Sequence, residues 1–405
     1  MPSILFVNRV YPPDSGATGR VLEQVAVTLK GAGWEVTVLA TAGDQPGLGT
    51  IERDGVKVIR AGGFFSKSSL AARAAGYALM IPSLLLKALI MPRADVVVTM
   101  TDPPMLAVIG PMLKVLKGSK LVHWAQDLYP EVAEEAGVFK QGGVVAEVIR
   151  ALSTVSLQSH DLVVSVGRCM SERLSLRGIS SEKVRLIPNI GMERDIVPCV
   201  RRDNSFRIRH GIAPETLVVM YSGNLGRAHE FKTILEAARL LQDQGEQEIL
   251  FLFVGEGPSR SVVEREAAEA GLSNVRFLPS QPGAAISESL GAADLHLVTM
   301  RQGMSGLVVP SKFYGVLAAE RPCLFVGPLD SEVALVIREV GCGEVIGISE
   351  GAKLATTIQS YRDQPDRIPE EGSRGLQWLR RQSDTGSQFL ECVEEAIGGI
   401  RSSAA

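Results

Sequence analysis

The order of apolar and polar positions predicts alternating strands and helices over the first half of the chain. Short, nearly uninterrupted apolar runs indicate buried strands. They occupy residues 3–8, 35–40, 56–61, 95–100, 120–124, 161–165 and 184–187. Helical patterns separate most of these runs. This rhythm predicts parallel strands joined by crossover helices, with ligands bound beyond the carboxyl ends of the strands.

A second alternating series follows a polar, basic stretch at 191–211, which has weak periodicity and is a candidate linker. Its expected strands occupy residues 216–222, 249–254, 275–278 and 295–299. Apolar residues then return at helical spacing from Trp378 to Ile397. The pattern therefore indicates two α/β domains and a helical tail.

The composition is that of an ordinary globular protein of about two domains, with 405 residues, 45% of them hydrophobic and 21% charged. A net charge of -3 gives no general reason to expect nucleic-acid binding. Five widely spaced cysteines without a Cys-x-x-Cys pair indicate neither a disulfide framework nor a zinc site. The chain opens on a strand-like run, so we expect a cytoplasmic protein without a secretion signal.

The stretch from Gly303 to Pro328 has the layout of an anion site. It begins with small residues that allow a ligand to approach the backbone, and continues through Pro-Ser-Lys into a helical pattern and an apolar strand. Ser311 and Lys312 are its candidate anion-binding residues. Their position after a late strand favours a phosphate ligand.

Two other loops follow strands and contain glycines at the start of a helix. The loop at 8–20 includes Gly16, which would allow contact with a phosphate or sugar, although an ordinary strand-to-helix turn explains it equally well. The stretch 223–232, GNLGRAHEFK, combines glycines with Arg227, His229 and Lys232. These are the components of a phosphate site, but Lys232 is equally consistent with an exposed helix charge.

Polar residues gather at the end of another strand, in HWAQDLYPE at 123–131. Asp127 could accept a hydrogen bond from a sugar hydroxyl or stabilise positive charge at a reacting carbon. Alternatively, it caps the following turn. We expect His123 to be a core histidine with its hydrogen bonds satisfied.

The segment 64–92 is the most hydrophobic part of the chain, but its apolar pieces are too short for a transmembrane helix. Two interpretations remain. It is either a crossover helix in the core, or a helix whose apolar face rests on a membrane surface with Lys67, Arg73 and Lys87 near lipid headgroups.

Six motifs in order give the chain a family resemblance. They are YPPDSGATGR, QDLYPE, IPN, YSGNLGRAHE, VGEGP and PSKFYGVLAAERP. Together they resemble the family-four glycosyltransferases with the GT-B fold, in particular the bacterial polysaccharide and O-antigen branch. The resemblance covers nearly the whole chain. Single motifs are weakly specific, whereas their order and spacing are fairly specific.

The resemblance implies an α/β fold of two Rossmann-like domains that face each other across a cleft. We expect an acceptor-side domain over 1–192 and a nucleotide-sugar donor domain over 193–373. The tail at 374–405 would cross back to the first domain, as in other GT-B proteins; alternatively, it packs on the second.

Site residues follow from the resemblance position by position. The expected contacts to the donor diphosphate are Gly16, Arg227, Lys232, Ser311 and Lys312. The expected nucleoside contacts are Asn224, Gly255, Gly257 and Leu278. Asp127 lies beside the position where the family often has a catalytic histidine, and we expect it to be catalytic. Neither a metal nor another cofactor is expected.

The chain departs from the family at one conserved feature. Many members carry two glutamates separated by seven residues, and the corresponding positions here are Leu307 and Gly315. The departure puts the sugar-binding geometry in question, and Lys312 could take over contact with the anion.

The expected activity is retaining transfer of a sugar, from a UDP-sugar rather than another nucleotide sugar, to a lipid-linked or polysaccharide acceptor in cell-surface glycan synthesis. The enzyme would work at the inner face of the cytoplasmic membrane, with segment 64–92 in peripheral contact. Two alternatives stay open: a nucleotide-sugar epimerase with the same fold, and a relative that binds a nucleotide sugar without catalysis.

Overall fold

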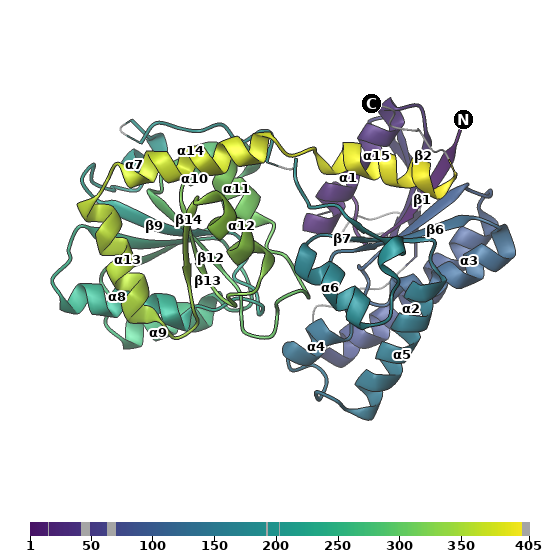
Figure 1. Ribbon diagram of the computed structural model, residues 1–405, viewed down its shortest axis with the longest axis horizontal. Helices are drawn as coiled ribbons and strands as arrows, with labels where there is room; N and C mark the ends of the chain where they lie inside the picture. The colour runs from purple at the N-terminus through teal and green to yellow at the C-terminus, as the bar shows by residue number, and fades with distance from the viewer. Residues whose placement is uncertain (15, 42–48, 63–69, 192, 202, 399–405) are drawn as a thin grey trace. The chain divides into compact units, whose positions relative to one another are not determined.

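A computed structural model describes residues 1–14, 16–41, 49–62, 70–191, 193–201 and 203–398, and it divides into two compact units (Figure 1). Unit 1 comprises Met1–Met192, Gly306–Val308 and Ser383–Ala405. Unit 2 comprises Glu193–Ser305 and Val309–Gln382. Each unit is built around a largely parallel sheet, which confirms the α/β prediction.

The sheet of unit 1 has eight strands in the order β3-β4-β2-β1-β5-β6-β7-β8. Their bounds are β1 (Ser3–Val7), β2 (Glu35–Thr41), β3 (Gly49–Arg53), β4 (Val56–Ala61), β5 (Val96–Met100), β6 (Lys120–Ala125), β7 (Leu162–Ser165) and β8 (Val184–Leu186). The seven strands predicted from apolar runs are confirmed. The sequence did not predict β3, because this antiparallel edge strand is exposed along its whole length and has no apolar signal.

Two helical layers cover this sheet, and the alternation of side chains along β1 separates them. Leu5 and Val7 pack in one cluster with α2, whereas Phe6 points to the other face and contacts Phe389 of α15. The helices of the unit are α1 (Ala17–Gly31), α2 (Leu70–Ile90), η1 (Leu106–Ile109), α3 (Gly110–Lys117), α4 (Glu131–Glu135), α5 (Val144–Ser159), α6 (Arg168–Leu176), η2 (Ser181–Lys183) and α15 (Thr385–Ala396).

Helix α2 accounts for most of the hydrophobic segment 64–92. One side of α2 buries Met80, Leu84 and Ala88 in the core, which confirms a crossover helix. Another side exposes three large apolar residues, which are Leu79, Leu86 and Ile90. Lys67 lies outside the described residues. Among the described helices, none combines the length and hydropathy that a membrane span requires.

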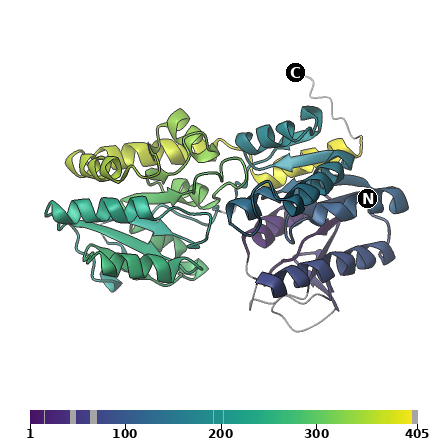
Figure 2. The ribbon, with the colours of Figure 1, turned by 90° about the horizontal axis from the view of Figure 1, so that it is seen from below.

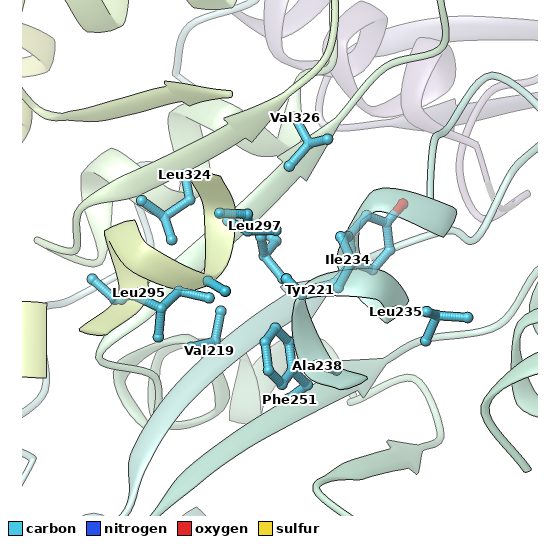
Figure 3. Close-up of a cluster of buried hydrophobic side chains, with 14 of the residues drawn as sticks. Val219, Tyr221, Ile234, Leu235, Ala238, Phe251, Leu295, Leu297, Leu324 and Val326 are labelled. Carbon is cyan, nitrogen blue, oxygen red and sulfur yellow. The ribbon is translucent and has the colours of Figure 1, made fainter. Parts of the chain in front are cut away.

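The sheet of unit 2 has six parallel strands in the order β11-β10-β9-β12-β13-β14. They are β9 (Leu217–Ser222), β10 (Ile249–Val254), β11 (Val275–Leu278), β12 (Leu295–Thr299), β13 (Cys323–Val326) and β14 (Gly343–Ile346). Figure 3 shows the core that β9, β10 and β12 form with helix α8. Strand β14 was not predicted, because its four residues GEVI are too short and too polar to form an apolar run.

Helices on both faces complete unit 2. They are α7 (Ser205–Arg209), α8 (Lys232–Asp243), α9 (Arg260–Glu269), η3 (Gly283–Ala285), α10 (Ile286–Gly291), α11 (Lys312–Ala318), α12 (Glu332–Val340), α13 (Gly351–Asp363) and α14 (Arg367–Arg380). The predicted linker at 191–211 is only partly a linker. It contains α7, whose Phe206 is completely buried in the core of unit 2.

The structure corrects the boundary predicted for the tail. Helix α14, which includes Arg374, packs on α11 and belongs to unit 2. The tail belongs to unit 1 from Ser383 onwards, and its helix α15 packs on α1 (Figures 1 and 2). Thr385 N donates to Ile190 O at 2.9 Å, and the ring of Phe389 lies 4.6 Å from that of Trp124. The segment that returns to unit 1 therefore begins at Ser383, whereas the sequence predicted that it begins at Arg374.

Candidate functional site

In unit 2, the loops that follow β9 and β10 pack tightly together because two positions are glycine. A Cβ at Gly255 would lie 2.0 Å from Gly223 O, and one at Gly257 would lie 2.5 Å from Asn224 Oδ1. Both glycines also have a positive φ, of 146° and 151°. Backbone packing and positive φ angles thus explain why both positions are glycine. The contact of Gly255 and Gly257 with a nucleoside stays a prediction.

Lys312 is the central cation of this loop cluster. The ammonium group is half-buried at the start of α11, donates a hydrogen bond to Tyr221 Oη and lies 3.5 Å from His229 Nε2. It also sits 4.0 Å from the centre of the Tyr221 ring. In the described part of the chain, no carboxylate pairs with it. Burial lowers the pKa of Lys312 from 10.5 to about 7.

His229 faces Lys312 as a neutral acceptor. Its Nδ1 donates to Thr299 O at 2.8 Å, which leaves the unprotonated Nε2 directed towards the ammonium group. Burial and the charge of Lys312 lower the pKa of His229 to about 3. Tyr221 is also neutral, and its hydroxyl donates to Asn224 O at 2.7 Å. The partners of Lys312 among the described residues are therefore neutral dipoles, and no anion offsets the burial that disfavours its charged form.

The other predicted residues of unit 2 lie on the same loops but are more exposed. Arg227 and Lys232 extend into solvent, and no side-chain partner of either occurs among the described residues. Asn224 is exposed as well. Ser311 precedes α11, and its hydroxyl caps no backbone amide. Leu278 is half-buried at the end of β11, where its carbonyl accepts from Gly255 N at 3.1 Å.

In unit 1, Gly16 precedes α1 at the end of the first strand-to-helix loop. Its φ of 167° is extended, a conformation that any residue can adopt. A Cβ at Gly16 would instead meet Val10 Cγ2 at 3.1 Å. The close packing of this loop therefore favours glycine at position 16. Contact between Gly16 and a phosphate stays a prediction.

A buried arginine holds the same loop, and no motif in the sequence marks it. Arg60, at the end of β4, is 7% exposed and forms an ion pair with Asp14. It also donates to the carbonyl oxygens of Tyr11 and Thr41, both at 2.9 Å. The apolar run at 56–61 predicts only that Arg60 lies on a strand, and its contacts with the loop at 11–14 arise from the fold.

Asp127 lies between β6 and α4 and is half-buried. The described residues show no hydrogen bond or ion pair to its carboxylate. Burial, together with the nearby carboxylate of Asp102, raises the pKa of Asp127 from 3.8 to about 7. Asp102 is itself paired with Arg9, with Arg9 Nε 2.6 Å from its Oδ1. Asp127 is thus an acidic group with no positive partner, suited to exchange a proton near neutral pH.

His123 and Gln126, which precede Asp127 in the same motif, both form hydrogen bonds inside unit 1. His123 is 4% exposed, and its Nδ1 lies 2.9 Å from Thr99 Oγ1. Burial and the neighbouring His160 hold the pKa of His123 well below its usual value, which confirms a core histidine. Gln126 and Asn189 exchange side-chain hydrogen bonds of 3.2 and 2.6 Å, so the QDLYPE and IPN motifs meet at this sheet edge.

The two positions that lack the family glutamates are Leu307 of unit 1 and Gly315 of unit 2. Leu307 is 1% exposed, and its carbonyl accepts from Leu128 N at 3.0 Å. A Cβ at Gly315 would meet Ile196 Cδ1 at 3.5 Å and Leu290 Cδ1 at 3.9 Å. Neither position therefore supplies a carboxylate to a ligand.

Comparisons with known proteins agree with this architecture. Residues 16–190 match the glycosyl transferase 4-like domain, and residues 203–310 match the glycosyl transferases group 1. A Pseudomonas aeruginosa protein, "Probable glycosyltransferase WbjE", is 29% identical over 350 residues, which is 85% of each chain.

Two solved structures share the fold over nearly all of both chains. WaaG, a glycosyltransferase involved in lipopolysaccharide biosynthesis, has a TM-score of 0.71 at 19% identity and covers 98% of this chain and 100% of its own. HepE from Anabaena, in complex with UDP-glucose, has a TM-score of 0.70 at 14% identity with the same coverage. With its two parallel-sheet units and both family matches, the chain belongs to the family-four, or group 1, glycosyltransferases and has the GT-B fold.

Proposed function

We propose that this protein is a retaining glycosyltransferase that takes a sugar from a nucleoside-diphosphate donor, with UDP favoured as the nucleotide. The observation that carries the proposal is Lys312. Among the residues that the structure describes, this half-buried amino group has two neutral partners, Tyr221 and His229, and no counter-ion. A donor diphosphate would supply that counter-ion, and binding would raise the pKa of Lys312 back towards its usual value.

Charge stabilisation is the main task of the donor site. As the bond between the sugar and the phosphate breaks, negative charge grows on the leaving diphosphate. Lys312 would stabilise that charge, together with the exposed Arg227 and Lys232 and the hydroxyl of Ser311. Gly16 would let the backbone of the first loop approach the same group. These positive charges come from the chain itself, so we propose transfer without a metal ion or another cofactor.

Asp127 would serve the acceptor. Its raised pKa of about 7 keeps the carboxyl close to the point where it can either donate or accept a hydrogen bond. It would orient the acceptor hydroxyl or stabilise positive charge at the sugar carbon. The hydroxyl proton would pass to the leaving phosphate oxygen, while the new glycosidic bond forms on the face that the phosphate leaves.

The acceptor that we propose is a lipid-linked or polysaccharide glycan of the cell surface. Its support is the likeness to WaaG, whose role lies in lipopolysaccharide biosynthesis, and the donor proposal is supported by the UDP-glucose bound to HepE. We also propose a cytoplasmic location at the inner face of the membrane, with peripheral contact through segment 64–92. The exposed Leu79, Leu86 and Ile90 of α2 support that contact.

One observation favours a second candidate, a relative that binds nucleotide sugars without catalysis. Leu307 and Gly315 replace the two family glutamates, so neither position carries a carboxylate of its own. Without these groups a donor could bind through its diphosphate and nucleoside while its sugar is not held for transfer. An epimerase is disfavoured by the same absence, because it needs an acid and a base beside the sugar.

A donor panel tests the proposal. The purified protein is incubated with UDP-, GDP- and ADP-sugars, with and without membrane lipid extracts, and nucleoside diphosphate release and glycolipid formation are measured. We expect UDP release that increases with acceptor, and a product whose anomeric configuration, read by NMR, equals that of the donor.

The other outcomes separate the alternatives. Binding of UDP without release from any sugar supports the non-catalytic relative. Inverted anomeric configuration rejects the retaining mechanism, and loss of activity on dialysis against EDTA rejects metal independence. A failure of UDP and its sugars to bind at all rejects the donor site around Lys312.

A further inference from the structure

Helix α5 of unit 1 exposes a line of apolar side chains with the spacing of a helix-pairing seam. Val145, Val148, Leu152 and Val155 follow one another at intervals of three, four and three residues, so they lie on one side of the helix. They are 61, 54, 57 and 66% exposed. Val144, in the first turn, is exposed beside this line. An exposed seam with this spacing is typical of a helix that pairs with another helix.

Helix α3 widens the apolar area. It exposes Met112, Val115 and Leu116, and it packs against α5. The α3–α5 surface, as we call these eight apolar residues of the two helices, consists of side chains that are each about half or more exposed. Their combined area is on the order of several hundred Å², and a standard protein interface takes about 800 Å² from each partner. The surface is therefore large enough for a stable protein contact.

The composition of α5 fits a protein partner better than a bilayer. Helices that rest on membranes combine their apolar face with lysines, arginines and bulky aromatic residues. The 16 residues of α5 include neither a lysine nor an aromatic residue, and Arg150 is engaged by Glu131, Glu134 and Glu147. Residues 127–160 contain five acidic and two basic side chains, a net charge of -3. This part of the chain would be repelled by an anionic surface.

The charges at the two ends of α5 have opposite signs. Near its beginning, Glu134 and Glu135 accept hydrogen bonds from the turn that precedes the helix, at 3.0 and 2.9 Å. Near its end, Lys114 and Lys183 donate to carbonyl groups of the last turn and of the residue that follows it. Asp161 balances part of this positive charge through Lys114, at 3.0 Å. The helix therefore runs from an acidic end to a basic end.

Both the seam and the charges are self-complementary in an antiparallel pair. The spacing of three, four and three residues reads the same in both directions. A two-fold axis level with Arg150 therefore places Val145 opposite Val155 of the second copy, and Val148 opposite Leu152. The same axis sets the basic end of each α5 beside the acidic end of the other. A parallel pair would bring like charges together instead.

We propose that the α3–α5 surface is a dimer interface, and that its partner is a second copy of this chain whose α5 lies antiparallel to the first. The apolar side chains leave water, and the charged ends pair across the two-fold axis. This inference goes beyond the proposed function and does not depend on it, because no residue of the surface is assigned to the donor or to the acceptor.

The first test measures the oligomeric state of the full chain by sedimentation velocity, between about 1 and 100 μM. The variant V148Q/L152Q changes two seam residues, and its matched control V200Q/I208Q changes two apolar residues of unit 2 that are 77 and 72% exposed. We expect the wild type and the control to dimerise equally, and V148Q/L152Q to raise the dimer Kd about tenfold or more. Circular dichroism and thermal unfolding verify that each variant folds.

The second test is a charge exchange that depends on the antiparallel geometry. Glu135→Lys places a lysine near Lys183 of the other copy, and Lys183→Glu places a glutamate near Glu135. Each variant alone should therefore raise the dimer Kd, by about threefold to tenfold. An equimolar mixture should form a heterodimer about as tight as the wild-type dimer, because each lysine again faces a glutamate.

A wild type that stays monomeric at about 100 μM overturns the proposal, as does a dimer that V148Q/L152Q leaves unchanged. A mixture that associates no better than its two components overturns the antiparallel arrangement. Flotation of a monomeric wild type with phosphatidylglycerol vesicles, lost in V148Q/L152Q, would assign the surface to a membrane instead. Sugar transfer enters none of these measurements, so a failure of the proposed function is recognised separately.

Discussion

Asp127 in unit 1 and Lys312 in unit 2 are both ionisable groups whose charged form is disfavoured by burial, one an acid and the other a base. Each is half-buried beyond the carboxyl end of a parallel sheet, and each lacks an oppositely charged partner among the described residues. Burial moves the pKa of both to about 7, upwards from 3.8 for the carboxyl and downwards from 10.5 for the ammonium group. In both cases the fold disfavours the charged form.

The difference between the two lies in what surrounds them. Lys312 has two neutral partners, Tyr221 and His229, that hold its amino group in place but do not offset the burial that lowers its pKa. Asp127 has no such partner, and its nearest electrostatic neighbour is the carboxylate of Asp102. Unit 2 therefore holds a positioned amino group whose charged form an anionic ligand would stabilise, whereas unit 1 holds a carboxyl group that can change between hydrogen-bond donor and acceptor. The following predictions test this contrast.

The largest expected effect is on catalysis at Asp127. Asp127→Asn keeps the size and polarity of the side chain but cannot become negatively charged, so we expect kcat to fall about 100-fold. Affinity for UDP, measured by calorimetry, should stay within a factor of about two, since the carboxyl is not assigned to the donor. The control is Glu52→Gln on the exposed strand β3, which should change neither quantity. An unchanged kcat in Asp127→Asn would contradict a catalytic role for Asp127.

The next effect is on donor affinity at Lys312. Lys312→Ala removes a charge-assisted hydrogen bond and should weaken UDP binding by about 1–3 kcal/mol. Arg227→Ala should act in the same direction. Lys353→Ala, which removes an exposed lysine from α13, is the control for a general loss of positive charge. Unchanged affinity in both site variants would exclude the anion site.

The pH dependence of stability should have opposite signs for the two groups. Between about pH 4 and 7 the folded Asp127 retains a proton that the unfolded chain releases, so unfolding free energy falls as pH rises. Between about pH 7 and 10.5 the unfolded Lys312 retains a proton that the folded protein releases, so unfolding free energy rises with pH.

Thermal unfolding across this range measures both slopes. Asp127→Asn should flatten the acidic part of the profile only, and Lys312→Met the alkaline part only. A profile that neither variant changes would show that the pKa values of the two groups are close to normal in the folded protein.

The smallest effect is expected at His229, which helps to hold Lys312. His229→Gln keeps polar atoms but loses the fixed position of Nε2, and it should weaken UDP binding by about 0.5–1.5 kcal/mol. The same variant tested together with Lys312→Ala should add little, because the two residues act as a pair. Additive losses would mean that His229 contacts the ligand by itself.

The sequence predicted most strands of the two sheets, because buried parallel strands appear as continuous apolar runs. β9 and β10 are examples, with nearly every residue buried. It did not predict β3 or β14, where exposure or short length removes that signal. Motifs also identified two candidate site residues, Asp127 of unit 1 and Lys312 of unit 2, whose roles stay predictions. Their surroundings were not predicted, because Tyr221 and His229 lie 91 and 83 residues from Lys312 and only the fold brings them together.

The return of the chain to unit 1 has a consequence for how the protein is made. Phe389 packs against Phe6 and Trp124, and Thr385 bonds to Ile190. Unit 1 is therefore completed by α15, a helix that is synthesised only after the residues of unit 2. Until then the face of the sheet that holds Phe6 lacks the cover of α15. A fragment that ends at 192 would carry this defect permanently, whereas one that also includes 383–398 would supply the missing cover.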